Sequence, residues 1–182
     1  VFAGAAGSVL LAFQTIQSQP YAKDARLVEI KGEKGDPFPN EWSMLLADPT
    51  ARGGVREIGI SNGLITAERT PLRGFTEVAN SPVIDSSKLL VDAPALFQAV
   101  QAEAVATRVS FHWLDYTLQV PANSLSPVWT VKLYDSLGGL VGTMGISADT
   151  GVLAVPMQLA EGVTSETDTK KVGGLVGKVS DL

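Results

Sequence analysis

The chain carries one pattern twice, about 86 residues apart, and this repetition constrains the fold more than any other feature. Each copy runs from a tryptophan through a leucine, an aspartate and a Gly-Gly pair to a Gly-Ile-Ser triplet. The matched positions are Trp42, Leu46, Asp48, Gly53-Gly54 and Gly59-Ile60-Ser61, and then Trp129, Leu133, Asp135, Gly138-Gly139 and Gly145-Ile146-Ser147. Several ordered features at nearly one offset are typical of an internal duplication. We therefore predict two copies of one folding unit.

A helix is expected at the start of each copy. Apolar residues recur there at i, i+4 and i+7, which places them on one helical face. They are Val9, Phe13 and Ile16 in the first copy, and Ala93, Phe97, Val100 and Ala104 in the second. Asp92 is a good N-cap for the second helix, and Pro94 suits its first turn.

Three strands are expected after each helix. The first is a short run over 26–31 in one copy and a long run over 108–120 in the other. The next begins at each tryptophan, and the last arm is a hairpin around each Gly-Ile-Ser triplet. The long run changes phase near Trp113, which predicts a bulge or bend. We expect its extra length to contribute more to the junction between the copies, with Trp113 in that junction.

The predicted fold class is therefore α+β: two similar repeats, each with one helix packed on an antiparallel three-stranded sheet. The repeats are assigned to residues 1–70 and 89–158, with a linker over 71–88 that contains prolines, serines and asparagines. A flexible tail follows over 159–182. In that tail an apolar helical spacing recurs at Val172, Leu175, Val176 and Val179.

The stretch from Gly59 to Gly63 reads GISNG and matches the G-x-S-x-G turn that presents the catalytic serine of α/β-hydrolases. The second copy breaks that spacing, because it reads GISADTG from Gly145 to Gly151. A nucleophile elbow also needs a helix after the serine, whereas LITAERTP alternates in polarity and ends at a proline. Asn-Gly favours a two-residue hairpin turn. We interpret Ser61 as a turn residue.

The repeated unit resembles the PepSY module. The second copy carries the better match, at Trp129, Val131, Leu133, Asp135 and the closing DTGVL over 149–153; the first is more degenerate, with SNGLI over 61–65. The resemblance covers nearly the whole chain, through short and mostly structural motifs. It implies exported bacterial domains without catalytic residues, some of which restrain thermolysin-type metalloproteases as part of their propeptides. A tandem αβ pair is also similar in architecture to the secreted β-lactamase-inhibitor proteins, which is an analogy of fold alone.

Composition argues against several classes of function. The chain has no cysteine, which excludes disulfides, thiolate catalysis and cysteine-bound metals. Its net charge is −5 and no basic run exceeds Lys170-Lys171, so we expect neither nucleic-acid binding nor a polybasic membrane patch. The apolar N-terminal run stops at Gln14, short of the roughly 20 residues of a transmembrane helix. No transmembrane segment is expected.

The single histidine, His112, has no acidic residue two positions away on either side. We therefore expect no metal site, no catalytic residue and no cofactor. Asp48 and Asp135 precede equivalent Gly-Gly pairs, which indicates hydrogen bonding in turns rather than a paired-carboxylate active site. The aromatic cluster around His112, Trp113 and Tyr116 is the candidate interaction surface, since aromatic residues dominate binding hot spots. Core packing is the alternative use for Phe111 and Trp113.

The function expected from these observations is non-enzymatic binding outside the cytoplasm. The chain begins with Val1, so we expect an exported mature protein, periplasmic or secreted, whose signal peptide has been removed. The expected partner is an envelope or secreted protein, with a peptidase among the choices, which the module would modulate or inhibit. The alternative is a small-ligand-binding or hydrolytic αβ domain with a pocket between the repeats.

Overall fold

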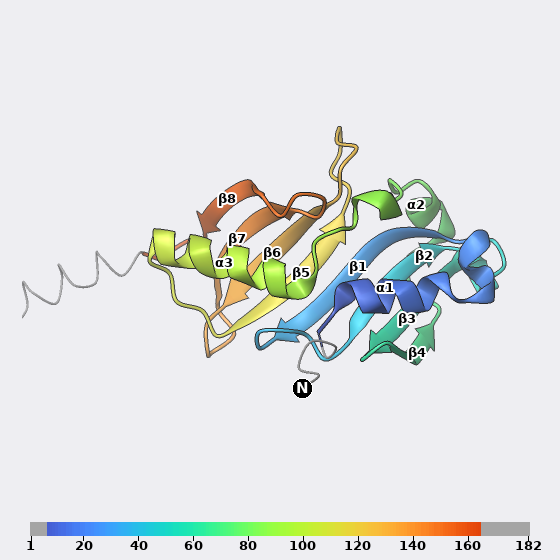
Figure 1. Cartoon of the computed structure of the whole chain (residues 1–182), viewed down its shortest axis with the longest axis horizontal. Coiled ribbons are helices and arrows are strands. Elements are labelled where there is room, and N and C mark those ends of the chain that lie inside the picture. Colours follow the sequence, from blue (N-terminus) through green and yellow to red (C-terminus); the bar gives the residue numbers. More distant parts are fainter. Residues whose placement is uncertain (1–6, 165–182) are drawn as a thin grey trace, which may run out of the picture.

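The computed structural model describes residues 7–164, which form one antiparallel sheet of eight strands (Figure 1). The strand order is β4-β3-β2-β1-β5-β6-β7-β8, so each half of the chain supplies one half of the sheet. The first half contributes β1 (Arg26–Gly35), β2 (Trp42–Ala47), β3 (Val55–Ser61) and β4 (Leu64–Arg69). The second contributes β5 (Trp113–Gln119), β6 (Val128–Tyr134), β7 (Leu140–Ser147) and β8 (Leu153–Leu159).

This architecture corrects the predicted fold class of one helix on a three-stranded sheet per repeat. Each half has four strands, because the hairpin at each Gly-Ile-Ser triplet contributes both of its arms, β3 with β4 and β7 with β8. The two halves also do not form separate sheets. Strand β1 pairs antiparallel with β5, which makes one continuous sheet of all eight strands.

The helices are few, and the two longest cover one face of the sheet (Figure 1). They are α1 (Val9–Gln17) and α3 (Ala93–Thr107), and each precedes the four strands of its half. Ser8 caps α1 and Asp92 caps α3, as predicted for Asp92. Shorter elements are η1 (Pro20–Lys23), η2 (Arg52–Gly54), α2 (Phe75–Ala79) and η3 (Ser86–Lys88).

The two halves are joined by pairing of β1 with β5, and the register of this pairing has local two-fold symmetry. Lys31 of β1 lies opposite Thr117 of β5, and these two residues are 86 positions apart, like the Gly-Ile-Ser triplets. On either side of this pair, Ile30 lies opposite Leu118 and Gly32 opposite Tyr116. The pairing is therefore symmetric about Lys31 and Thr117. Duplicated strands that pair edge to edge in this way hide one exposed edge from each copy.

The main core lies between the sheet and the two long helices, and its centre is aromatic. Trp42 of β2 and Trp129 of β6 occupy matching positions, opposite Ile60 and Ile146 of the following strands. Their ring centroids are 5.7 Å apart. Tyr116 lies 5.7 Å from Trp42 and 6.5 Å from Trp129. The repeated tryptophans therefore meet beside the junction and pack the two halves into one core.

A second, smaller core lies on the opposite face of the sheet, under α2. Its buried apolar side chains are Val28, Leu45, Ala47, Val55 and Val78. Helix α2 and the η3 turn both fall within residues 71–88, the segment expected as a linker. Part of that segment thus packs on the first half. Residues 165–182 of the expected tail, with Val172, Leu175, Val176 and Val179, lie outside the described residues.

The expectation about the junction is also corrected. Strand β1 has 10 residues and β5 only 7, so the first half supplies the longer strand. Arg108 ends α3 in the left-handed conformation, with φ 55°, and the chain enters β5 only at Trp113. The predicted change in the alternation of apolar residues near Trp113 therefore marks the point where the connection between α3 and β5 ends. Tyr116, not Trp113, is the large side chain buried at the junction.

Candidate functional site

The face of the sheet opposite α1 and α3, here called the open face, carries the candidate functional site. Apart from the part beneath α2, no helix of the described chain covers it. One row of paired residues crosses it on all eight strands and consists of small side chains except for one lysine. From β4 to β8 the row is Ala67, Gly59, Ser43, Lys31, Thr117, Thr130, Gly145 and Val155. The middle of the open face is consequently shallow.

A charged groove of 640 Å³ occupies the first half of the open face, over β1 to β4. Four acidic and four basic side chains line it, and so their formal charges cancel. The acidic ones are Glu29, Glu33, Glu41 and Glu57, and the basic ones are Lys31, Lys34, Arg69 and Arg73. Glu41 can lie flat across the sheet because Gly59 beneath it has no side chain. A Cβ there would lie 2.6 Å from the Glu41 Cδ atom.

Most of these groove charges are paired within the chain. Arg69 lies 3.5 Å from both Glu41 and Glu57. Glu29 is buried and accepts a hydrogen bond from Arg73 at 3.1 Å, with the Lys31 ammonium 3.2 Å away. Its other oxygen accepts a hydrogen bond from the Gln119 amide of β5. Glu29 is thereby tied to both halves of the sheet, as a buried carboxylate must be paired to remain charged.

An aromatic patch occupies the second half of the open face, at the end where β5 begins and β6 ends. Trp113 and Tyr134 are directly opposite one another on these strands. Their rings are stacked, with centroids 6.2 Å apart and planes at 23°. His112 meets Trp113 edge-on at 5.7 Å. Trp113 and Tyr134 are half-buried and His112 is exposed, so the patch is accessible from solvent.

Asp115 supplies a fixed carboxylate beside this patch. Its Oδ1 accepts the backbone N–H of Lys34 at 2.8 Å. Burial raises the pKa of the Tyr134 hydroxyl, and the charge of Asp115, a hydrogen bond to it and the charge of Glu33 raise this pKa further. Two carboxylates therefore lie close enough to act on the phenol. The patch combines aromatic rings with negative charge.

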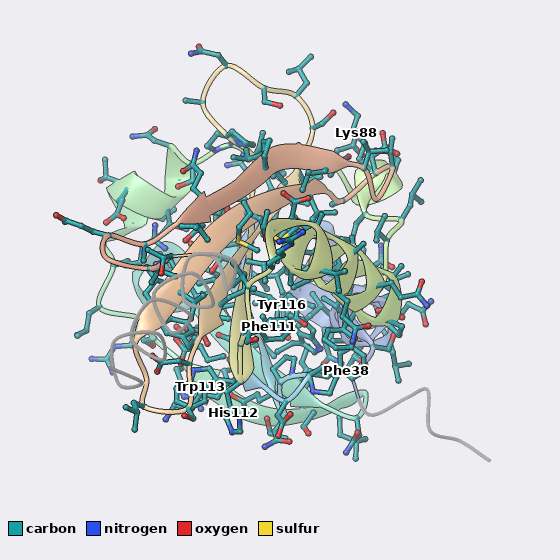
Figure 2. The ribbon with its side chains drawn as sticks, turned by 90° about the vertical axis from the view of Figure 1, so that its left-hand side faces the viewer. Phe38, Lys88, Phe111, His112, Trp113 and Tyr116 are labelled. Carbon is teal, nitrogen blue, oxygen red and sulfur yellow. The ribbon has the colours of Figure 1, made fainter. Side chains whose placement is uncertain are left out.

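The predicted interaction residues do not form one cluster. Figure 2 shows His112 and Trp113 together at one end of the sheet, with Tyr116 further inside. Tyr116 is only 1% exposed, and its hydroxyl donates to the Pro37 carbonyl at 2.8 Å. Burial raises its pKa. Tyr116 belongs to the core, while His112 and Trp113 remain candidates for binding.

The GISNG prediction is confirmed as a hairpin. Asn62 and Gly63 both have positive φ, at 51° and 74°, as a turn between β3 and β4 requires. Ser61 Oγ donates to the Asn40 carbonyl at 2.6 Å. In the sheet, β2 and β1 lie between Ser61 and the strand that follows His112. The serine and the only histidine are therefore not brought together.

The repeated aspartates accept hydrogen bonds from backbone N–H groups in turns, as the sequence indicated. Asp48 accepts the backbone N–H of Thr50 at 2.9 Å, and Asp135 accepts that of Leu137 at 2.9 Å. Asp48 differs in being completely buried and in accepting a 2.7 Å hydrogen bond from Arg56 Nε. The Arg56 guanidinium lies 4.1 Å over the Tyr21 ring. This network stabilises the first half and faces away from the open face.

Two further hollows lie away from the groove and the aromatic patch. One of 180 Å³ lies at the junction of β1 and β5, lined by residues that include Glu29, Arg73 and Gln119. Another, of 580 Å³, lies at the end of α3 beside Val105 and Val109. Over residues 7–164 no group of three acidic or histidine side chains is placed to hold a metal ion. The chemistry on the open face is consequently that of charges, hydroxyls and aromatic rings.

Sequence reasoning missed Tyr134, Asp115 and the groove residues. For Tyr134 and Asp115, the alternation of buried and exposed residues along their strands was a usable signal. Alternation from the buried positions Leu133 and Leu114 places Tyr134 and Asp115 on the outer side of their strands. The groove carried no local signal, because its members come from β1 to β4 and from the segment before α2, and only the sheet order brings them together.

The comparisons identify no relative: no family model, no curated protein and no solved structure matches the chain. Within the described part of the chain, no helix is both long and apolar enough to span a membrane.

Proposed function

We propose that this chain is a non-enzymatic binding module whose protein partner docks on the open face of the sheet. The observation that carries the proposal is the stacked Trp113–Tyr134 pair, which stands half-exposed on a broad, shallow surface. Tryptophan and tyrosine are the residues most enriched in protein-binding hot spots. The small residues that cross the sheet leave room for a partner surface to approach the strands.

The charged groove supports a protein partner over a small apolar ligand. Small-molecule sites are mostly apolar cavities with a few polar groups. This groove instead has eight charged side chains of both signs along an open surface. Balanced charges of this kind favour selection among partners by electrostatic complementarity, more than they add raw affinity.

The alternative function, a small-ligand or hydrolytic site between the repeats, receives less support. The space at the junction measures 180 Å³, below the roughly 300 Å³ at which ligand pockets begin. Trp42, Tyr116 and Trp129 fill the other side of the sheet there. The serine of GISNG sits in a hairpin away from the only histidine.

The proposed class of partner rests on the resemblance of the repeated unit to PepSY modules. It points to an exported chain that binds an envelope or secreted protein, with a peptidase as the first class to test. The two long helices and the main core lie on one face of the sheet, so a protein docked on the open face away from α2 would leave the main core undisturbed.

A pair of matched variants tests this proposal. Thr130→Arg with Thr143→Arg places two long charged side chains on the shallow part of the open face, while Ala106→Arg places one on the exposed side of α3. Immobilised wild type and Ala106→Arg should retain the same protein from an envelope or secreted fraction, and the double variant should lose it. Retention by all three proteins, or by none, would contradict docking on this face.

A further inference from the structure

We propose that the aromatic patch receives an arginine side chain of the partner, with its guanidinium stacked on Trp113 and Tyr134 and paired with Asp115. This inference rests on the proposed function, because it names the chemistry that the partner brings to the open face. It concerns the second half of the sheet and the adjoining part of β1, where Glu33 also lines the charged groove; the ion-paired residues of the groove take no part in it.

The ring geometry suits a planar cation. Trp113 and Tyr134 are stacked at 6.2 Å with only 23° between their planes, so a planar cation that lies against one side of the pair is nearly parallel to both rings. A guanidinium within about 6 Å of an aromatic centroid is attracted by the negative face of the ring. Arg56 already makes such a contact with Tyr21, at 4.1 Å, but no cation of the described chain occupies Trp113 or Tyr134 in this way.

The carboxylate beside the rings is held in place before any partner arrives. Asp115 Oδ1 accepts the Lys34 backbone N–H at 2.8 Å, and Asp115 is close enough to the Tyr134 hydroxyl to raise its pKa. The bond to Lys34 restricts the orientation of the carboxylate, so less side-chain freedom is lost when a cation binds. The negative charge of Glu33 acts on the same hydroxyl and adds to the local potential.

Among the described residues, the two carboxylates near this patch have no ion-pair partner, in contrast to the other three carboxylates of the groove. In the groove, Glu29, Glu41 and Glu57 each form an ion pair with a lysine or arginine. Across residues 7–164, neither Asp115 nor Glu33 has a lysine or arginine nitrogen within 4.0 Å. This holds although Lys132 lies directly opposite Asp115 on β6. The patch therefore has negative charge to offer to a partner.

Arginine fits this combination better than lysine. Its guanidinium is planar, stacks on aromatic faces and presents a fork of N–H donors that matches a carboxylate. The ammonium of lysine is compact and strongly hydrated, and it cannot stack. One arginine can thus use the rings and Asp115 together.

An NMR titration tests the proposal without knowledge of the partner. The probe is the blocked tripeptide acetyl-Gly-Arg-Gly-amide, and its control replaces arginine with citrulline, which is neutral and nearly isosteric. Trp42 and Trp129 are buried, 3% and 0% exposed, so Trp113 is the indole that a surface ligand reaches. Its Nε1–H signal is assigned by its loss in Trp113→Phe.

We expect the arginine peptide to shift the Trp113 indole signal and the amide signals of Asp115 and Tyr134 in a saturable way. The citrulline peptide should leave them in place. Asp115→Asn should raise the apparent Kd roughly threefold, as expected for loss of one solvent-exposed ion pair. Asp149→Asn, in the turn between β7 and β8 and outside both the patch and the groove, is the matched control and should leave the apparent Kd unchanged.

Three results would overturn the inference: no saturable shift at Trp113, equal shifts with citrulline, or shifts confined to the groove residues. These results are distinct from failure of the proposed function. A partner captured through the open face, together with a silent titration, would reject the arginine contact alone. A positive titration with no difference among the capture variants would reject the docking of a protein there.

Discussion

Ser8 and Asp92, the N-cap residues of α1 and α3, hydrogen-bond to each other beside the junction of the two halves, with Ser8 Oγ donating to Asp92 Oδ2 at 2.7 Å. Asp92 Oδ1 also accepts the N–H groups of Ala93 at 2.8 Å, of Val9 at 2.9 Å and of Leu10 at 3.3 Å. One carboxylate therefore serves the N-termini of both helices, where unpaired N–H groups and the helix dipole concentrate positive charge.

Asp92→Ala should lower the free energy of unfolding by about 2 kcal/mol, since α3 loses its N-cap, at roughly 1 kcal/mol, and α1 keeps Ser8 but loses the hydrogen bonds of its first turn to the Asp92 carboxylate, at about the same cost. Urea unfolding measures this loss. Asp85→Ala is the matched control, because Asp85 caps only the short η3 turn through Ser87. An equal loss in the two variants would show that Asp92 does not serve both helices.

Tyr116→Ala should be much more damaging than Trp113→Ala. Tyr116 is buried among Trp42 and Trp129, and removal of such a ring costs about 3–5 kcal/mol. Trp113 is half-buried on the open face, so its loss should cost roughly a third as much. Both variants should unfold in a single transition, because β1 and β5 form one sheet. The reverse order of stabilities would return Trp113 to the core.

Asp48 should make the first half sensitive to acid. Its complete burial alone would raise its pKa, but the hydrogen bonds from Thr50 and Arg56 outweigh this and lower it. A lowered folded-state pKa contributes stability that is fully present above the ordinary carboxyl pKa of about 3.9 and is lost as the pH falls through the folded value. Wild type should therefore be more stable than Asp48→Asn at pH 7.

The difference between wild type and Asp48→Asn should shrink steadily below about pH 4, as the native carboxylate becomes protonated. Thermal unfolding of both proteins across pH 2–7 measures it. A constant difference over that range would show that the charge of Asp48 is not what stabilises the turn.

Ser61→Ala should change the free energy of unfolding by less than about 1.5 kcal/mol, the value of one hydrogen bond, here the one to the Asn40 carbonyl. A serine-directed fluorophosphonate should not label the wild-type protein, since Ser61 belongs to a hairpin turn. Mass spectrometry of the treated protein measures this. Stoichiometric labelling at Ser61 would reverse the assignment.

The features that could be predicted from the sequence are the local ones. The two long helices and the Asn62-Gly63 hairpin depend on periodicity and turn chemistry within a few residues, and the structure has them where the pattern indicated. The repeat also predicted correctly that Asp48 and Asp135 form hydrogen bonds within turns. Such features need no knowledge of distant contacts.

The features that could not be predicted depend on pairing across the chain. The β1–β5 ladder joins residues 86 positions apart, and no local pattern specifies which two edges of a duplicated sheet will meet. Strand β5 begins only at Trp113, after α3 ends at Arg108 in the left-handed conformation, and this non-glycine residue gives little sign of that conformation in the sequence. The groove residues were missed because only the order of the strands brings them together.

The central claim, that the open face binds a protein, is tested most directly by photo-crosslinking from single positions. A benzophenone amino acid is placed at Thr130, in the middle of the open face, or at Ala106, on the exposed side of α3. Each protein is then irradiated in the envelope or secreted fraction. The account predicts a covalent adduct of one defined mass from Thr130 and none from Ala106. Adducts from Ala106 alone, or equal adducts from both positions, would contradict it.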